Sequence, residues 1–225
     1  MLKENRGKLV LTSIVILVPI LIGLILWNQL PDKVPTHWNV SGEVDGWSSK
    51  AFAVFLLPSI LLVLHWVCIL VSNTDPKWKD YPAKMLSIVL WICPFISIIL
   101  MLSVYGVALG LELKIERIMP LLVGGMFIIV GNYLPKCKQN YTMGIKLPWT
   151  FHDEENWNRT HRMAGKLWFG IGLVMICSAL LPTKIIFWVL MFVIVVAVLV
   201  PTLYSYLFYR KKTKEEDTKK EERGE

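Results

Sequence analysis

Long apolar runs separated by short polar segments dominate the chain. Four runs exceed the length of about 20 apolar residues that crosses a membrane as a helix, and two shorter runs lie near its lower limit of about 17. The long runs are residues 9–30, 51–72, 85–109 and 185–209, and the shorter ones are 118–134 and 165–181. With 55% apolar and 18% charged residues, the pattern predicts an all-α integral membrane protein with six transmembrane helices.

The distribution of Lys and Arg predicts the orientation of these helices. Of the 24 Lys and Arg residues, the predicted outer segments hold only Lys33, Lys50, Lys114, Arg117 and Lys184. Basic residues collect on loops that stay in the cytoplasm. The asymmetry therefore predicts a multi-pass protein of the cell membrane with cytoplasmic N- and C-termini. The net charge of +7 is interpreted as an orientation signal, and direct nucleic-acid binding is not expected.

The segments between the runs suggest three regions. Residues 1–82 are predicted to form a two-helix module with an outer loop at 31–50, and residues 83–209 a four-helix module with an inner loop at 135–165. Residues 210–225 mix both signs of charge and lack apolar side chains, which predicts a disordered cytoplasmic tail.

The outer loop contains two Pro, two Gly and several turn-forming residues, so it is predicted to be an ordered, turn-rich loop. Trp38 and Trp47 are of the residue type that settles at the membrane–water boundary. His37, Asn39 and Asp45 have the chemistry for a small polar site. A loop that hydrogen-bonds to itself is the favoured interpretation of these three residues.

The inner loop is predicted to contain a helix start. Thr150 and Asp153 have capping-box spacing, with Asp in place of Glu. We expect a short helix at 153–163, lying near the inner surface or leading into the fifth span. Trp157 and His161 are four residues apart and would share one face of it.

The part of the inner loop before this helix is predicted to be extended. Gly144 is expected to form a turn, and Pro148 disfavours helical geometry at Leu147. Trp149 and Trp157 are expected to anchor the loop at the membrane boundary.

Residues that could support catalysis are scattered by the predicted topology. His37 lies outside, His65 within a span, and His152 and His161 inside, so these four cannot share a metal ion in a monomer. No nucleophile elbow, zinc-protease or phosphate-loop motif occurs. We therefore predict no catalytic, metal-binding or cofactor-binding residues and no enzymatic activity. His65 is expected to be a helix-packing hydrogen bonder, because no acidic partner for ion-coupled transport is visible.

Two spaced patterns together resemble a known family. The inner pattern consists of Asn140, Gly144, Ile145, Pro148, Trp149, Thr150, Trp157, His161 and Gly165. It resembles the Sdp immunity family of bacterial membrane proteins. The outer pattern, Pro31, Pro35, His37, Trp38, Asn39, Gly42, Asp45, Lys50 and Pro58, resembles a membrane domain of unknown function often found beside that segment. Lys146 stands where many members have Arg, which keeps the charge but loses the two-pronged geometry.

The resemblance implies protection of the cell from a secreted antimicrobial peptide toxin. It also implies capture of a small transcriptional repressor at the membrane, as in the family's best understood system. The bilayer, the toxin and that repressor are the implied partners. The outer loop is the only outer segment large enough to recognise such a peptide, so the expected outer binding residues are His37, Trp38, Asn39, Asp45 and Trp47. The expected inner binding residues are Asn140, Gly144, Lys146, Pro148, Trp149, Thr150, Trp157 and His161. A small-molecule or lipid transporter and a signalling receptor whose inner loop binds a regulator remain alternatives.

The predicted topology can be tested by thiol labelling in a background without native cysteines. Ser48→Cys and Thr183→Cys should react with an impermeant thiol reagent in intact cells, because both positions are predicted to be outside. Thr213→Cys should react only after lysis. Labelling of Thr213→Cys in intact cells would overturn the charge-based orientation.

Overall fold

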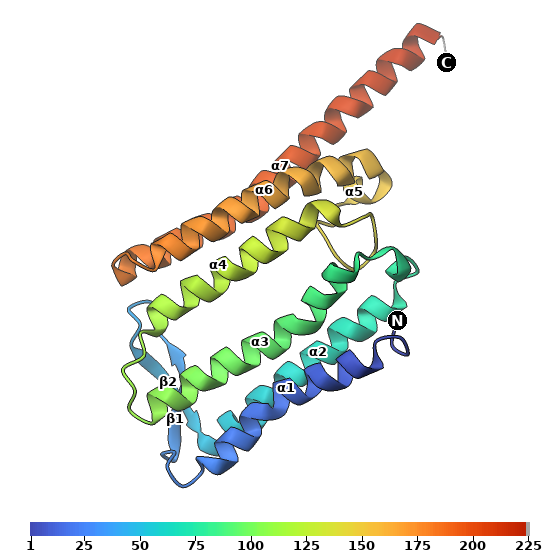
Figure 1. Cartoon of the computed structure of the whole chain (residues 1–225). Coiled ribbons are helices and arrows are strands. Elements are labelled where there is room, and N and C mark those ends of the chain that lie inside the picture. Colours follow the sequence, from blue (N-terminus) through green and yellow to red (C-terminus); the bar gives the residue numbers. More distant parts are fainter. Residues whose placement is uncertain (224–225) are drawn as a thin grey trace. The chain divides into compact units, whose positions relative to one another are not determined.

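The computed structural model describes residues 1–223 and, for Asp80, the backbone alone. Within that range the chain is mostly helical, with one β-hairpin (Figure 1). The elements are α1 (Arg6–Ile25), β1 (Lys33–Trp38), β2 (Val44–Ser49), the π-helical turn η1 (Phe52–Leu56), α2 (Leu57–Thr74), the 3-10 turn η2 (Trp78–Asp80), α3 (Ala83–Ala108), α4 (Ile115–Tyr133), the 3-10 turn η3 (Leu134–Lys136), α5 (Pro148–His152), α6 (Glu154–Ser178) and α7 (Thr183–Arg223).

Five of the described helices are long and apolar enough to cross a membrane: α1, α2 with η1, α3, α4 with η3, and α7. No more than 33% of the most apolar window of any of them is buried inside the protein, so most of each apolar surface is left for lipid. The predicted run at 165–181 forms the second half of α6, whose first half is polar. Length and composition therefore mark five helices as spans, where six were predicted.

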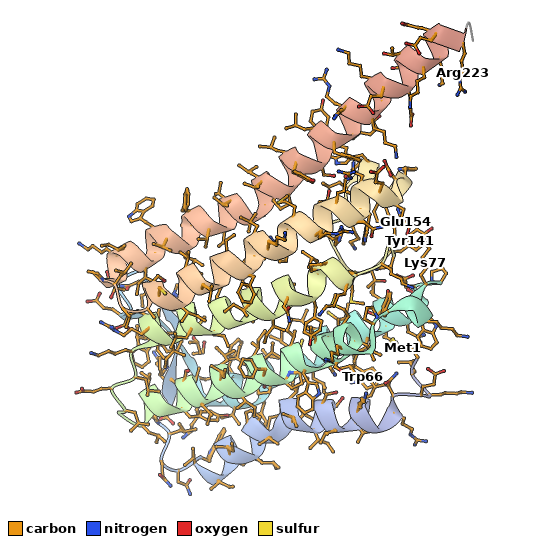
Figure 2. All side chains as sticks on the ribbon, turned by 45° about the horizontal axis from the view of Figure 1, so that its top comes forward. Met1, Trp66, Lys77, Tyr141, Glu154 and Arg223 are labelled. Atoms are coloured by element: carbon orange, nitrogen blue, oxygen red, sulfur yellow. The ribbon has the colours of Figure 1, made fainter. Side chains whose placement is uncertain are left out.

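The chain divides into two compact units, Met1–Met119 with Ala179–Phe187, and Pro120–Ser178 with Trp188–Glu225. In the first unit α3 packs against both α1 and α2, so this division falls well after the module boundary predicted at residue 82. Met1 and Trp66 lie at the end of this unit opposite the hairpin (Figure 2).

Polar side chains connect the helices of the first unit. The hydroxyl groups of Ser97 and Tyr105 donate to the carbonyl oxygens of Ile16 and Pro19 over 2.9 Å each. His65 is fully buried, and its Nε2 lies 3.0 Å from the hydroxyl of Thr12. This contact agrees with the predicted packing role of His65, because it links α1 to α2.

The outer loop is a β-hairpin, which the sequence prediction missed. Strands β1 and β2 pair antiparallel, with irregularities on both sides of His37. In the turn, the side-chain oxygen of Asn39 accepts hydrogen bonds from the backbone N–H groups of Ser41 and Glu43. Gly42 has a φ of 81°, which favours glycine there. The all-α prediction therefore needs correction at this one element.

In the second unit, pairs of glycines bring α4 and α6 into backbone contact. A Cβ at Gly172 would lie 2.6 Å from the carbonyl oxygen of Gly124, and one at Gly165 would lie 2.7 Å from that of Gly131. Both helices thus carry glycines seven residues apart, on facing sides. A Cβ at either of the two α6 glycines would force the helices to separate.

Helix α7 continues to Arg223, so the prediction of a disordered tail from residue 210 is wrong for the described residues. The tail sequence favours a helix, because Glu and Lys four residues apart can pair, as Lys211 and Glu215 do at 3.8 Å. Lys212 also binds Asp153 at 2.7 Å, which ties the start of the tail to α6. Residues 224–225 of the predicted tail lie outside the described residues.

The glycine contact between α4 and α6 predicts a large effect from one methyl group. Gly172→Ala should lower the stability of the protein by on the order of 1–3 kcal/mol, because the added Cβ meets backbone atoms. Gly170→Ala is the matched control, since a Cβ there meets nothing within 4 Å. Thermal unfolding of both variants in detergent measures the difference, and equal melting temperatures would contradict the close contact.

Candidate functional site

The stacked rings of Trp157 and His161 form the centre of the inner motif. Both lie in the first half of α6 and are almost completely buried, with ring centroids 4.1 Å apart and an interplanar angle of 20°. The indole N–H of Trp157 donates to the carbonyl oxygen of Cys137 over 2.8 Å. The shared face predicted for this pair is therefore confirmed. The predicted membrane-boundary role of Trp157 is wrong, because its ring is enclosed by protein.

Two hydrogen bonds define the tautomer of His161. The backbone N–H of Ile145 donates to its Nε2 over 2.9 Å, so this nitrogen must carry a lone pair. Its Nδ1 lies 2.8 Å from the carbonyl oxygen of Trp157 and must therefore carry the proton. Burial lowers the pKa of His161 to about 4, against the smaller opposing effect of the Trp157 hydrogen bond. The imidazole is thus a neutral fixed link between the loop and α6.

Gly144 allows the loop to pass directly over these two rings. Its φ is 114°, a conformation that residues with a Cβ rarely adopt. A Cβ would also overlap His161 Nε2 and lie 2.9 Å from the Trp157 ring. The turn predicted at this residue is confirmed, and the close ring contact supplies a second reason for glycine.

Asn140 organises the loop from within. Its side-chain oxygen accepts hydrogen bonds from the backbone N–H groups of Thr142 and Met143 at 2.9 and 2.7 Å. Its amide group donates to the carbonyl oxygen of Lys138 over 2.8 Å. Because Asn140 is only 3% exposed, it acts as a structural bracket for the loop and offers almost no surface to a partner.

Thr150 belongs to a short helix that was not predicted. It is buried in α5, and its hydroxyl accepts a hydrogen bond from the N–H of Leu147 over 2.9 Å. Leu147 is extended, with φ −118° and ψ 152°, as predicted from the following proline. The predicted capping box of Thr150 with Asp153 is therefore wrong. Asp153 alone caps α6, accepting hydrogen bonds from the N–H groups of Glu155 and Asn156.

Asp153 also forms the main ion pair of the motif. Burial acts to raise the pKa of its carboxyl group, but the hydrogen bonds from Lys212, Asn156 and Glu155 outweigh this and hold the pKa below its ordinary value. The carboxylate therefore stays charged at neutral pH and holds α6 to α7 through Lys212.

The exposed part of the motif consists of fewer residues than predicted. Gly144, Lys146 and Pro148 are exposed, and the Lys146 ammonium group contacts the carbonyl oxygen of Tyr141 at 3.4 Å. Trp149 is half-buried against α7, with its ring centroid 5.4 Å from that of Tyr206 and 6.2 Å from that of Tyr209. Only this exposed group could contact a partner without a conformational change.

Several important residues were missed because their partners are distant in sequence. Asn156 is buried on α6, donates to the carbonyl oxygen of Ser205 over 3.0 Å, and accepts from the hydroxyl groups of Ser205 and Thr160. Gln139 donates to the carbonyl oxygens of Thr150 and Phe151 at the end of α5. The sequence offered no local signal for Asn156, because its partner Ser205 lies 49 residues away.

The outer candidate residues lie together on the hairpin, in the first unit. The imidazole Nδ1 of His37 lies 2.5 Å from a carboxylate oxygen of Asp45, and both side chains are exposed. Trp47 is 58% exposed. Trp38 instead packs against the buried cluster formed by η1, α3 and strand β1, and Asn39 forms the turn. Within residues 1–223, no group of His, Cys, Asp and Glu side chains is placed to hold a metal ion.

The apolar helices and the exposed hairpin identify the chain as a multi-pass membrane protein. Residues 136–205 match the SdpI/YfhL protein family, and residues 14–62 match a domain of unknown function, DUF1648. The chain is 27% identical over 207 residues to the immunity protein SdpI of Bacillus subtilis (strain 168), covering 91% of this chain and 97% of that protein. The chain is therefore similar to the SdpI/YfhL family over its inner loop and closing helices. No solved structure matches it.

The buried imidazole predicts that the inner loop loosens in acid. The pKa of His161 is lowered from 6.5 to about 4 in the folded state, so its contribution is complete above pH 6.5 and is lost as the pH falls towards 4, by up to roughly 3 kcal/mol. The protection factor of the Ile145 amide in hydrogen exchange should fall over this range. His161→Gln should remove most of this pH dependence, and His152→Gln, at an exposed position, should retain it. An unchanged protection factor between pH 6.5 and 4 in the native chain would contradict the assignment.

Proposed function

We propose that this protein is an integral-membrane immunity protein that protects the cell from a secreted antimicrobial peptide. The observation that carries the proposal is the match to immunity protein SdpI, which extends over 91% of the chain and 97% of the relative. Such coverage includes both the outer and the inner segment, so the similarity is not confined to one shared module. The proposal concerns protection alone, because capture of a repressor rests only on the family resemblance.

We further propose six spans with both termini in the cytoplasm. The sixth crossing would be the apolar second half of α6, which α4 supports through the glycine contacts. Lys166, at the start of this half, could extend towards the membrane surface and lengthen the crossing. In this arrangement the hairpin is outside, and the inner motif lies at the cytoplasmic surface.

The hairpin is the proposed surface for peptide recognition. An extracellular peptide meets only outer segments and the lipid-facing sides of the helices, and the hairpin is the largest outer segment. It combines exposed apolar groups, Trp47 at 58% and Val40 at 54%, with the exposed His37–Asp45 pair. Aromatic residues beside a few polar groups are typical of recognition surfaces. Trp38 would support this surface from below, because it packs into the core.

Expression of the chain in a sensitive Gram-positive host should raise tolerance to a membrane-active peptide of the Sdp type. The combined variant His37→Ala, Trp47→Ala and Asp45→Ala should lose most of that tolerance at normal abundance, because it removes the exposed apolar ring and the polar pair. Ser41→Ala, an exposed change in the same hairpin, should keep it. Growth in graded peptide concentrations, with immunoblotting of membranes, measures both.

The outcomes separate the parts of this proposal. If the hairpin variant protects normally while Trp149→Ala at equal abundance does not, recognition lies elsewhere than the hairpin. If the unmodified chain gives no tolerance to such a peptide but moves a solute into vesicles, the transporter alternative replaces the immunity function.

A further inference from the structure

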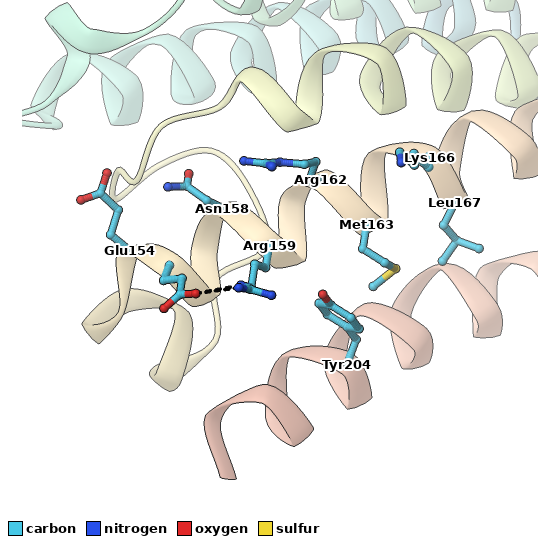
Figure 3. Close-up of a pocket in the computed structure, with 9 residues that line it drawn as sticks. Glu154, Asn158, Arg159, Arg162, Met163, Lys166, Leu167 and Tyr204 are labelled. Carbon is cyan, nitrogen blue, oxygen red and sulfur yellow. Dashed lines mark hydrogen bonds and ion pairs between the residues drawn. The ribbon is translucent and has the colours of Figure 1, made fainter. Parts of the chain in front are cut away.

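A groove lies between the first half of α6 and the facing part of α7, within the second unit. Its volume is about 960 Å³. Figure 3 shows the side chains of α6 that line it, with Tyr204 approaching from α7. The groove lies on the opposite part of α6 from the buried Trp157–His161 rings, and the inner motif therefore leaves it open.

The charges along the groove change from one end to the other. At the N-terminal end of α6, Glu155 binds Arg159 at 2.9 Å and Lys212 at 3.6 Å, while Glu154 is exposed. One turn further on, Arg162 and Lys166 have neither an ion pair nor a hydrogen bond with any described residue. Like charges four residues apart repel each other. An anion between them would remove that repulsion.

Apolar side chains alternate with these two cations along α6. Met163 and Leu167 line the groove beside them. Further along the helices, Phe169 and Leu173 on α6 and Leu199 and Leu203 on α7 are between 41% and 56% exposed. A ligand complementary to the whole groove has a negatively charged headgroup next to Arg162 and Lys166 and an apolar chain that continues past Leu167.

We propose that this groove binds an anionic phospholipid of the cytoplasmic leaflet. Arg162 and Lys166 hold the phosphate, the hydroxyl of Tyr204 borders the headgroup, and an acyl chain follows Met163 and Leu167. The assignment goes beyond protection from a peptide and depends on the polar half of α6 lying at the membrane boundary. Free phosphate would satisfy the two cations but would leave the apolar side chains of the groove uncovered.

Native mass spectrometry of the full chain, purified in mild detergent and supplied with phosphatidylglycerol or phosphatidylcholine, tests the proposal. The chain should retain one phosphatidylglycerol in preference to phosphatidylcholine. The double variant Arg162→Gln, Lys166→Gln should weaken this retention on the order of tenfold, because it removes both cations at the site. The charge-conserving variant Arg162→Lys, Lys166→Arg should retain the lipid, which controls for folding.

The matched control is Lys219→Gln, Lys220→Gln, which removes the same charge far along α7 and should leave retention unchanged. Equal loss in both Gln double variants would show general attraction and overturn the site. No preference between the two lipids would overturn it as well, as would displacement by millimolar inorganic phosphate. Failure of this site would leave the immunity assay unaffected, so the two proposals are tested separately.

Discussion

The close contact between the backbones of α4 and α6 is the constraint on which the inner motif depends. Gly131 faces Gly165, and the ring of Pro135 lies against Gly165 at the end of α4. Two residues later, the carbonyl oxygen of Cys137 reaches the indole N–H of Trp157. The loop can then cross the two stacked rings at Gly144 and bind His161. A wider separation of the helices would break each of these contacts in turn.

This sequence of contacts explains why so much of the motif is buried. Asn140, Thr150, Trp157 and His161 are each at most 3% exposed, although a cytoplasmic loop of this length would usually present such groups to solvent. Their hydrogen bonds stay within the loop and α6. The pattern of matching residues therefore describes an internal architecture, and the outward-facing chemistry lies on other residues, such as Lys146, Arg162 and Lys166.

Features determined by local sequence were predicted well, and those determined by distant contacts were not. The apolar runs predicted the helices, Gly144 the turn, and the spacing of Trp157 and His161 their common face. The hairpin was missed because Pro35, Gly46 and the irregular pairing around His37 obscure the alternation of a strand. Asn156 and the ion pair of Asp153 were missed because Ser205 and Lys212 approach from α7, about 50 to 60 residues away. The cap was assigned to the wrong partner because the Thr150 hydroxyl bonds within the preceding turn, to the N–H of Leu147. The tail was predicted to be disordered from its mixed charges alone, but the apolar helix before it continues into it as α7.

The continuity of α7 has a mechanical consequence. At 1.5 Å per residue, its 41 residues extend for roughly 60 Å, and about a third of that length lies beyond the apolar part. Figure 2 shows Arg223 at its far end. A partner that contacts this charged segment meets a rod whose side chains are already arrayed at fixed intervals. Binding of such a partner would not have to offset the conformational entropy that a flexible tail loses. Any tilt of α7 within the bilayer would also produce a larger displacement at its far end.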